Sequence, residues 1–196
     1  MKKNLITAFL MAIATTILLG LIYPLVITGL AQLLFHDKAN GQIITRNGEA
    51  IGSRIIAQPF TSPKYFHPRP SAAGNGYDAA NSGGTNFAST NQKLIDRVRA
   101  DAATLHQENP SQPIPVDLLT TSASGLDPEI SPAAAEFQIP RIARERGLSE
   151  SALRDLVQKH TSQRDLGLLG EPRVNVLELN LALINGNYSS VYTSYR

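Results

Sequence analysis

The residues of this chain that could perform chemistry are few, and their spacing points to structural roles. The four histidines lie in separate segments without the paired spacing of a metal site, so we interpret them as surface residues. Three serines could act as nucleophiles, but no base partner is visible in the sequence, and loop serines are commonly turn residues. We therefore expect no catalytic residue and no metal ligand among them. These residues are His36, His67, His106, His160, Ser71, Ser82 and Ser124.

Four carboxylates around the loop at residues 122–132 raise the alternative of a cation site. They are Asp117, Asp127, Glu129 and Glu136. Their spacing matches no calcium-binding loop with its defined ligand positions. Asp127 precedes a proline and is typical of a turn, and acidic residues also favour helix starts. Solvated charges therefore explain the group more simply than a cation does.

Motifs and composition exclude several further classes. The chain has neither a Walker-type glycine loop nor a glycine–serine–glycine elbow, so a self-sufficient nucleotide hydrolase or esterase is disfavoured. The net charge of +2 comes from Lys2 and Lys3, because the other sixteen Lys and Arg residues balance the sixteen Asp and Glu residues. No basic stripe is left to bind nucleic acid. Cysteine is absent, so stability must come from a packed core.

Residues 4–35 carry no charged side chain, and this stretch determines whether the rest of the chain is attached to a membrane. A bilayer core of about 30 Å needs roughly 20 apolar residues as a helix, and this run is longer. A cleaved signal peptide, the alternative, has an apolar stretch of roughly 7 to 15 residues, so we expect a retained anchor at residues 1–36 with its span at about residues 8–30. Lys2 and Lys3 predict a cytoplasmic N-terminus. The main domain is then periplasmic or extracellular.

Small or polar side chains recur at every fourth residue of this stretch. Such a ridge allows a second helix to approach closely, which is how helices associate in lipid. We interpret Ala8, Ala12, Thr16 and Gly20 as an assembly surface, while the alternative is that small residues are common in any membrane helix. Pro24 continues the row; it lacks a backbone donor and predicts a kink between Gly20 and Pro24.

Residues 37–196 have the size of one ordinary domain, and their mixed patterns predict an α+β fold with short helices and a small sheet. Asn47-Gly48 between β-branched runs predicts a hairpin. Residues 59–91 are rich in Pro, Gly, Ser and Asn and predict a long loop.

Helix starts are marked by capping residues. We expect helices after Thr90, after Ser131 and after Ser149, with a break or kink at Pro140 and a helix end at Gly147. The apolar alternation at residues 174–184 leaves strand and helix open, because Leu, Glu and Ala also favour helix. Residues 185–196 are polar, and we expect them to fray.

Several segments, in this order behind one anchor, resemble the KdpC family, the C subunits of the Kdp potassium-transporting ATPase. The resemblance covers nearly the whole chain, and its run at residues 168–176 is highly specific. Glu129 departs from the family pattern, in which a histidine is common after Asp-Pro. The segments include Tyr23-Pro24-Leu25, Ile51-Gly52-Ser53, Tyr65-Phe66, Arg69-Pro70-Ser71-Ala72, Ser124-Gly125-Leu126-Asp127-Pro128 and Leu168-Leu169-Gly170-Glu171-Pro172-Arg173-Val174-Asn175-Val176.

The resemblance implies a non-catalytic accessory subunit of an ATP-driven potassium importer in a bacterial inner membrane. Its implied role is to support assembly and to act as a catalytic chaperone that raises the ATP affinity of the P-type ATPase subunit. The implied partners are that subunit, a potassium-translocating subunit and a small single-span subunit. Potassium is the transported ion, no cofactor is bound tightly, and ATP is reached through the complex.

The resemblance also links Gln138 to nucleotide binding. The residue itself has an alternative reading as a helix-end amide that bonds nearby backbone. With Lys2 and Lys3 in the cytoplasm, Gln138 would face the side where ATP is scarce. The alternative function for the whole chain is a membrane-tethered extracytoplasmic enzyme or small-ligand-binding domain that uses the glycine-rich loop at residues 73–86.

Overall fold

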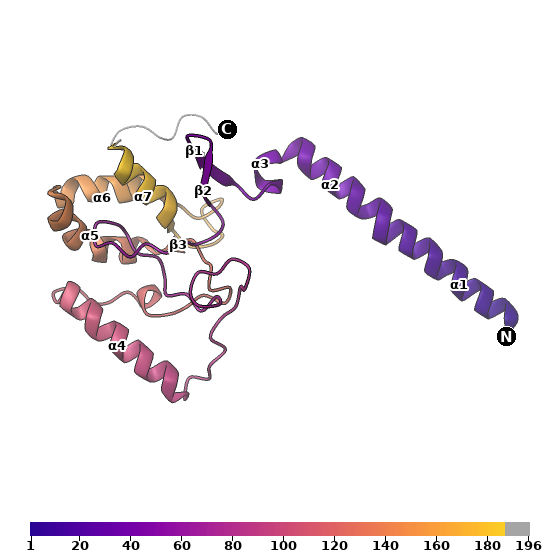
Figure 1. The fold of residues 1–196 in the computed structure, drawn as a ribbon, viewed down its shortest axis with the longest axis horizontal. Coiled ribbons are helices and arrows are strands. Elements are labelled where there is room, and N and C mark those ends of the chain that lie inside the picture. The colour runs from indigo at the N-terminus through magenta and orange to yellow at the C-terminus, as the bar shows by residue number, and fades with distance from the viewer. Residues whose placement is uncertain (187–196) are drawn as a thin grey trace. The chain divides into compact units, whose positions relative to one another are not determined.

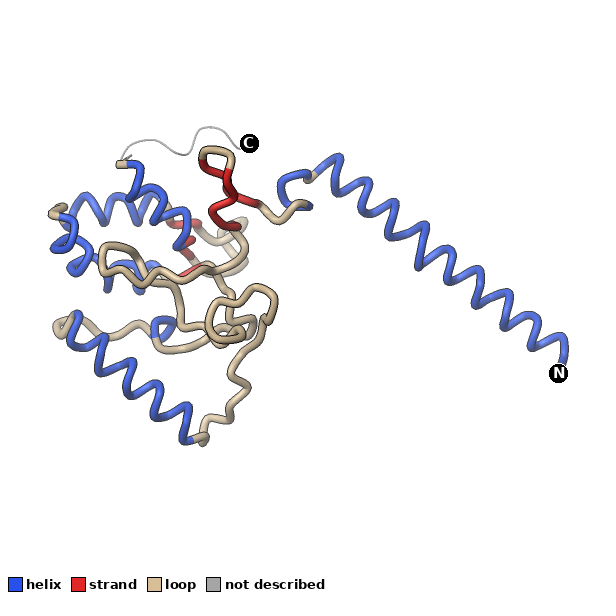
Figure 2. Tube along the Cα trace, in the orientation of Figure 1, coloured by secondary structure: helices blue, strands red, loops and turns tan. Residues whose placement is uncertain are grey.

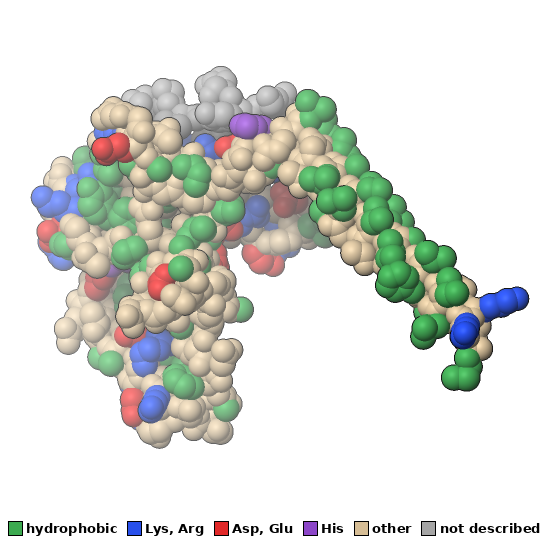
Figure 3. Space-filling model, turned by 45° about the vertical axis from the view of Figure 1, so that its right-hand side comes forward, with side chains coloured by type: hydrophobic (Ala, Val, Ile, Leu, Met, Phe, Trp, Pro, Cys, Tyr) green, Lys and Arg blue, Asp and Glu red, His purple; other side chains and the backbone are tan. Residues whose placement is uncertain are grey.

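The computed structural model describes residues 1–186 and divides into two compact units, residues 1–51 and the part that begins at Gly52. The first unit contains a helical stretch of 33 residues from Lys2 to Leu34, made of α1 (Lys2–Ile17), the π turn η1 (Leu18–Ile22) and α2 (Tyr23–Leu34). The short helix α3 (His36–Ala39) follows. By length and composition the stretch can cross a membrane. Most of its exposed side chains are apolar, and basic side chains occur only at the N-terminal end (Figure 3).

The π turn lies directly before Pro24. Tyr23 N–H bonds Leu18 O, one residue further back than in an α-helix. A proline ring clashes with the carbonyl four residues before it, which is that of Gly20, and the wider turn accommodates this ring. The irregularity falls where the sequence predicts a kink, and the helix continues through it.

The predicted hairpin is confirmed. Strands β1 (Ile43–Arg46) and β2 (Glu49–Ser53) pair and are connected by Asn47 and Gly48 alone. Both connecting residues have positive φ, 54° and 84°, as a tight hairpin turn of the I′ type requires.

The second unit is built on helices α5 (Pro132–Arg146), α6 (Glu150–Lys159) and α7 (Val176–Asn185), which gather together in Figure 1. An antiparallel sheet of three short strands accompanies them: β3 (Glu129–Ile130), β5 (Arg173–Asn175) and β4 (Thr161–Ser162), in that order. Val174 is the central residue of the sheet, opposite both Ile130 and Thr161. The apolar core lies between these elements and includes Phe66, Ile130, Phe137, Ile139, Ile142, Leu153, Leu156, Val174, Val176, Leu179 and Leu183.

The predicted caps of α5 and α6 are confirmed. Ser131 Oγ accepts Ala134 N–H at 3.0 Å, Ser149 Oγ accepts Ala152 N–H at 3.2 Å, and Gly147 ends α5 with φ 66°. Of the break or kink expected at Pro140, the break is wrong, because α5 runs unbroken through the proline. Its neighbours Ile139 and Ile142 are fully buried, so packing outweighs the hydrogen bond that the proline removes.

Two further elements complete the described chain. Helix α4 (Gln92–Glu108) is capped by Asn91, one residue after the predicted cap. A 3-10 turn, η2 (Val116–Leu118), follows it.

The ambiguous segment at residues 174–184 is the end of β5 followed by α7. The loop predicted at residues 59–91 is confirmed (Figure 2), and it begins earlier, directly after β2. The predicted fraying concerns mainly residues 187–196, which lie outside the described residues.

Together the elements form an α+β fold behind one long apolar helix, as the sequence predicts. The domain limits predicted at residues 36 and 37 concern a membrane boundary and stay a prediction.

Candidate functional site

Gln138 is the one site residue that the family resemblance singles out, and it lies in the core on α5 with 1% of its surface exposed. Its Oε1 accepts His67 N–H and Arg141 Nη2, both at 2.8 Å. Its Nε2 donates to His67 O at 3.1 Å and to Ala134 O at 3.2 Å. An amide side chain has two donors and two principal acceptor positions, and all four are used here.

Asn180, on α7, binds the neighbouring residue in the same way. Its Oδ1 accepts Phe66 N–H at 2.9 Å and its Nδ2 donates to Phe66 O at 2.9 Å. Asn180 is fully buried. Gln138 and Asn180 thus bind the backbone of two successive residues as adjacent strands of a sheet would. We call residues 62–67 the strap; the two amides bond its last two residues.

Two arginines of α5 bind the rest of the strap. Arg141 donates to the carbonyl oxygens of Pro63 and Tyr65, the latter at 3.0 Å. Arg146 donates to Lys64 O at 2.6 Å, and its guanidinium lies 4.8 Å from the centre of the Tyr65 ring. Five successive carbonyl groups, from Pro63 to His67, therefore accept hydrogen bonds from side chains of α5 and α7. The backbone of this irregular segment is satisfied without strand pairing.

The arginine that binds the strap, Arg141, is itself paired with a carboxylate. Arg141 Nε bonds Glu108 Oε1 at 2.7 Å, and both side chains are largely buried. His67 Nε2 lies 3.0 Å from Ser62 O, and because a carbonyl oxygen can only accept, the ring nitrogen donates this hydrogen bond. Burial lowers the pKa of His67, and the charge of Arg141 lowers it further. The ring is therefore neutral at pH 7.

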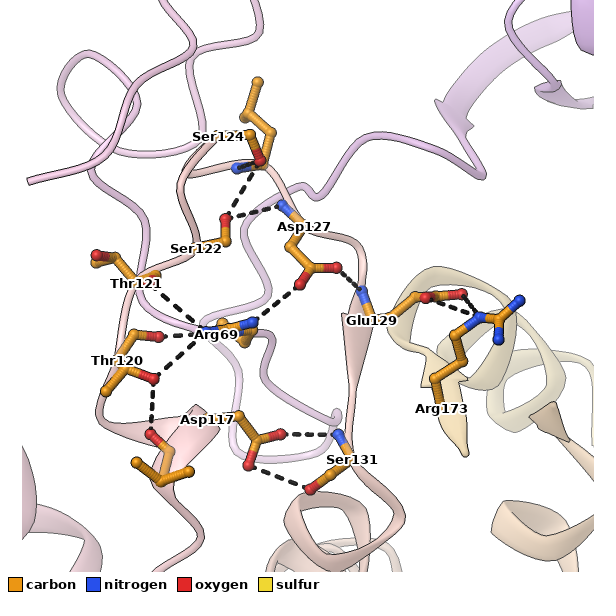
Figure 4. A network of polar contacts seen from close by, with 12 residues as sticks. Arg69, Asp117, Thr120, Thr121, Ser122, Ser124, Asp127, Glu129, Ser131 and Arg173 are labelled. Atoms are coloured by element: carbon orange, nitrogen blue, oxygen red, sulfur yellow. Dashed lines mark hydrogen bonds and ion pairs between the residues drawn. The ribbon is translucent and has the colours of Figure 1, made fainter. Parts of the chain in front are cut away.

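A second polar cluster joins two distant loops of this unit (Figure 4). Arg69 Nη1 pairs with Asp127 Oδ2 at 3.0 Å, and the same guanidinium donates to the carbonyl and hydroxyl oxygens of Thr120, each at 3.3 Å. Ser71 Oγ donates to Gly125 O at 2.6 Å. We call this group, Arg69 and Ser71 against Thr120, Gly125 and Asp127, the clasp. It joins two of the segments that carry the family resemblance.

Gly125 allows the two loops of the clasp to approach. Its φ is +67°, and a Cβ there would lie 2.6 Å from both Ala73 N and Gly83 O. Ser124 O next to it accepts Gly83 N–H at 2.8 Å and Ser82 Oγ at 3.0 Å. Tyr77 OH donates to Arg69 O at 2.8 Å, and burial raises the pKa of Tyr77 to about 12. The glycine-rich loop is thus docked along its length.

Each of the four carboxylates bonds a group of its own chain. Asp117 accepts Ser131 N–H at 2.7 Å, Asp127 holds Arg69, Glu129 pairs with Arg173 at 3.1 Å and Glu136 pairs with Arg154 at 2.6 Å. No group of three or more His, Asp or Glu residues suited to a metal ion occurs among residues 1–186. Burial raises the pKa of Glu129, while Arg173 opposes that shift.

The histidines and serines are placed less uniformly than the sequence predicts. His36 and His106 are exposed, but His67 is half-buried and His160 is buried, so the surface interpretation is wrong for His160. His160 ends α6 directly before β4, where packing covers it, and this burial lowers its pKa. Ser71, Ser82 and Ser124 bond backbone groups of Gly125, Ser124 and Leu126, in agreement with turn roles.

The small-residue row of the anchor is present up to the π turn. A Cβ on Gly20 would lie 3.9 Å from Thr16 Cγ2, so these two residues share a face. Ala8, Ala12, Thr16 and Gly20 are all exposed, and their assembly role stays a prediction. Gln32, beyond the π turn, instead forms a reciprocal amide pair with Asn40, at 3.2 and 3.1 Å.

The comparison with known proteins agrees along nearly the whole chain. Residues 5–185 match the family model described as KdpC, the c chain of K+-transporting ATPase. A potassium-transporting ATPase KdpC subunit from Koribacter versatilis (strain Ellin345) is 70% identical over 183 residues, which are 93% of this chain and 95% of that protein. Subunits of the same name from Rhodopseudomonas palustris (strain BisB18) and Acidobacterium capsulatum are 54% and 55% identical, over 93% and 92% of this chain.

Proposed function

Because this chain belongs to the KdpC family, the c chains of K+-transporting ATPases, we propose that it is a membrane-anchored, non-catalytic subunit that supports assembly of a potassium importer. The observation that carries the proposal is the 33-residue apolar stretch, none of whose side chains is buried by the chain itself. Such a helix needs lipid and other helices around it. The proposed partners are the potassium-translocating, P-type ATPase and small single-span subunits.

The second unit supports a structural rather than an enzymatic role. Its buried polar groups in the strap and the clasp are bonded within the chain, and the hydroxyls of Ser71 and Ser82 donate to backbone oxygens. A hydrolytic site would need a nucleophile beside a base. These contacts therefore favour a structural role over the alternative of a tethered enzyme or ligand binder that uses residues 73–86.

Removal of residues 37–196 tests the division of labour between anchor and domain. The chain that ends at residue 36 should still co-purify with the other subunits but should not support potassium-dependent ATPase activity. Full activity of the complex with the shortened chain would contradict a role for the domain. Complete loss of co-purification would instead place the assembly contacts outside the anchor.

The orientation proposed from Lys2 and Lys3, with the N-terminus in the cytoplasm of the bacterial cell and the domain outside the inner membrane, has a direct test. The chain has no native cysteine, so a single introduced one reports its compartment. Gln158 is exposed on α6 and is a suitable position, whereas buried Gln138 is not. Gln158→Cys in spheroplasts should react with an impermeant maleimide, and Asn4→Cys should not. The reverse pattern would overturn the orientation.

We propose further that any effect of this chain on ATP affinity is transmitted through the strap. Gln138 has no free hydrogen-bonding capacity, so direct contact with a nucleotide would require it to release at least one of its bonds to His67, Arg141 or Ala134. Asn180→Ala is a matched control, because it frees Phe66 as Gln138→Ala frees His67. Transmission through the strap predicts a similar rise in KM for ATP in the complex for both variants. A rise confined to Gln138→Ala would support direct contact.

A further inference from the structure

Exposed apolar side chains of the second unit gather in one short loop. Residues 165–170, which we call the leucine loop, lie between β4 and β5, and in them Leu166 is 91%, Leu168 82% and Leu169 62% exposed. The other large apolar side chains exposed in the described part of this unit are separated along the chain: Ile55, Phe87, Val116 and Ile184. A leucine that stays in water adds nothing to the stability of its own fold. Three within four residues therefore indicate a contact with another molecule.

The leucine loop is held in one conformation before any contact. Asp165 N–H bonds Leu169 O at 2.8 Å, and Leu169 N–H bonds Asp165 O at 2.9 Å. Leu166 has φ +54°, in the left-handed region that residues with a side chain avoid. Strained residues of this kind cluster at functional positions, and a loop that is already ordered loses little entropy on binding.

The charges around the leucine loop are neutralised within the chain. Arg164 pairs with Glu171 at 2.6 Å, and Arg173 pairs with Glu129 at 3.1 Å and approaches Asp165 at 3.9 Å. An apolar centre inside a neutral polar rim is the usual anatomy of a protein–protein contact. A lipid surface fits less well, since segments at membrane interfaces combine apolar side chains with Trp or Tyr and with Lys or Arg that face the lipid headgroups, whereas the loop has no aromatic residue and the arginines beside it are paired.

The size of the patch identifies the kind of partner. Stable complexes of separate proteins bury at least about 1,200 Å², and three leucines cover far less, so the loop would not hold two copies of this chain together. A small contact is sufficient when an anchor already keeps the two partners side by side, because the tether supplies a high effective concentration. We propose that the leucine loop docks into an apolar hollow on another subunit of the K+-transporting ATPase, which rests on the proposed function as a subunit of that complex.

Photo-crosslinking within the purified complex tests this contact. A benzoylphenylalanine at position 168 should crosslink to one ATPase subunit, identified by mass spectrometry. The matched control is position 116, where Val116 is 70% exposed outside the loop, and it should give at least about tenfold less product. Crosslinks to lipid alone, to a second copy of this chain, or to no subunit of an intact complex would overturn the proposal, as would equal yields at both positions.

A triple variant gives an independent measurement. Leu166→Ser with Leu168→Ser and Leu169→Ser should leave the unfolding temperature of the chain unchanged and should speed its loss from the complex on detergent dilution by at least about tenfold. Val116→Ser should change neither quantity. Unchanged retention of the triple variant would overturn the leucine loop contact alone. If the unaltered chain does not co-purify with any ATPase subunit, the proposed function fails, and the loop proposal fails with it.

Discussion

The anchor and the strap differ in what covers their side chains and polar groups. In the strap, five successive carbonyl groups accept bonds from side chains of α5 and α7. In the anchor, no residue from Lys2 to Leu34 is buried, although its backbone is satisfied by the helix itself. The polar groups of the strap are therefore satisfied within the chain, whereas the side chains of the anchor are exposed and can contact other molecules. Changes in the two regions should affect different measurements, folding in one and assembly in the other.

The largest effect on folding is expected at Arg141. Arg141→Met keeps the apolar length of the side chain but leaves Glu108 without its buried partner and two strap carbonyls without a donor. Removal of one member of a buried ion pair costs about 3–5 kcal/mol in the free energy of unfolding. Urea unfolding of the full chain in detergent, followed by circular dichroism, measures this loss.

Two controls show whether the loss comes from burial. Arg154→Met likewise removes a paired arginine, but Arg154 is about half exposed and pairs with Glu136 and Glu150 at the surface. This variant should have the same free energy of unfolding as the unaltered chain. Arg141→Met combined with Glu108→Gln should be less destabilised than the two single changes added together. If Arg141→Met and Arg154→Met lost the same free energy of unfolding, burial of the ion pair would not be the cause of the loss.

The next largest effect is expected at the clasp. Gly125→Ala places a Cβ against two backbone atoms at 2.6 Å in a left-handed conformation, and should cost at least about 2 kcal/mol. Gly83→Ala is the matched control, because no atom lies within 4 Å of its added Cβ and its φ is not positive. Thermal unfolding of both variants and hydrogen exchange of the glycine-rich loop measure the difference. If Gly125→Ala unfolded at the same temperature as Gly83→Ala, close approach would not be what holds the two loops together.

Much of this organisation follows from local sequence rules. The long apolar helix, the Asn47-Gly48 hairpin and the caps at Ser131 and Ser149 depend on neighbouring residues, and all four are confirmed, whereas the membrane role of the helix stays a prediction. The limits of those rules appear at Pro140, where the local preference for a break is overruled by the burial of Ile139 and Ile142. Packing between distant segments is not visible in a local pattern.

The strap is the main feature that the sequence did not reveal. Its bonds join residues 71 and 114 positions apart, so no spacing rule connects Gln138 with His67 or Asn180 with Phe66. A weak signal existed in Asn180, a polar residue between Leu179 and Leu181 in an apolar run. A buried amide in such a run must find partners, but the sequence does not say which. The alternative reading of Gln138 is right that the amide bonds backbone but wrong that it lies at a helix end, because Gln138 lies inside α5 and two of its bonds join the distant His67.

A smaller effect on folding is expected from pH. Burial is the main cause that lowers the pKa of His67 and of His160 below the ordinary 6.5. The unfolded chain then binds more protons than the folded one, so stability falls as pH drops from about 6.5 towards the folded pKa values. Glu129 acts in the opposite sense at lower pH, because burial raises its pKa and protonation relieves that cost.

The pH effect is measured as the unfolding temperature of the full chain at pH 7.5 and 5.5. The unaltered chain should unfold at a lower temperature at pH 5.5. His67→Gln with His160→Gln should reduce the difference between the two pH values, because the replaced groups do not titrate. A difference of the same size in the double variant would assign the pH dependence to other groups.

The smallest effect on folding, and the sharpest test of the comparison, is expected in the anchor. Leu at Ala12, Thr16 and Gly20 together adds bulk to exposed positions, and Gly20 has room for a side chain because its nearest neighbour would lie at 3.9 Å. Unfolding of the second unit should therefore be unchanged. Co-purification with the ATPase subunits should be lost, since bulky side chains prevent close approach of helices. The control with Leu at Ile13, Ile17 and Val26 adds no such bulk to the small-residue row, so assembly should persist. Loss of co-purification in both variants would mean that the whole surface of the anchor, and not this row, makes the contacts. Co-purification of both variants would mean that the anchor is surrounded by lipid alone.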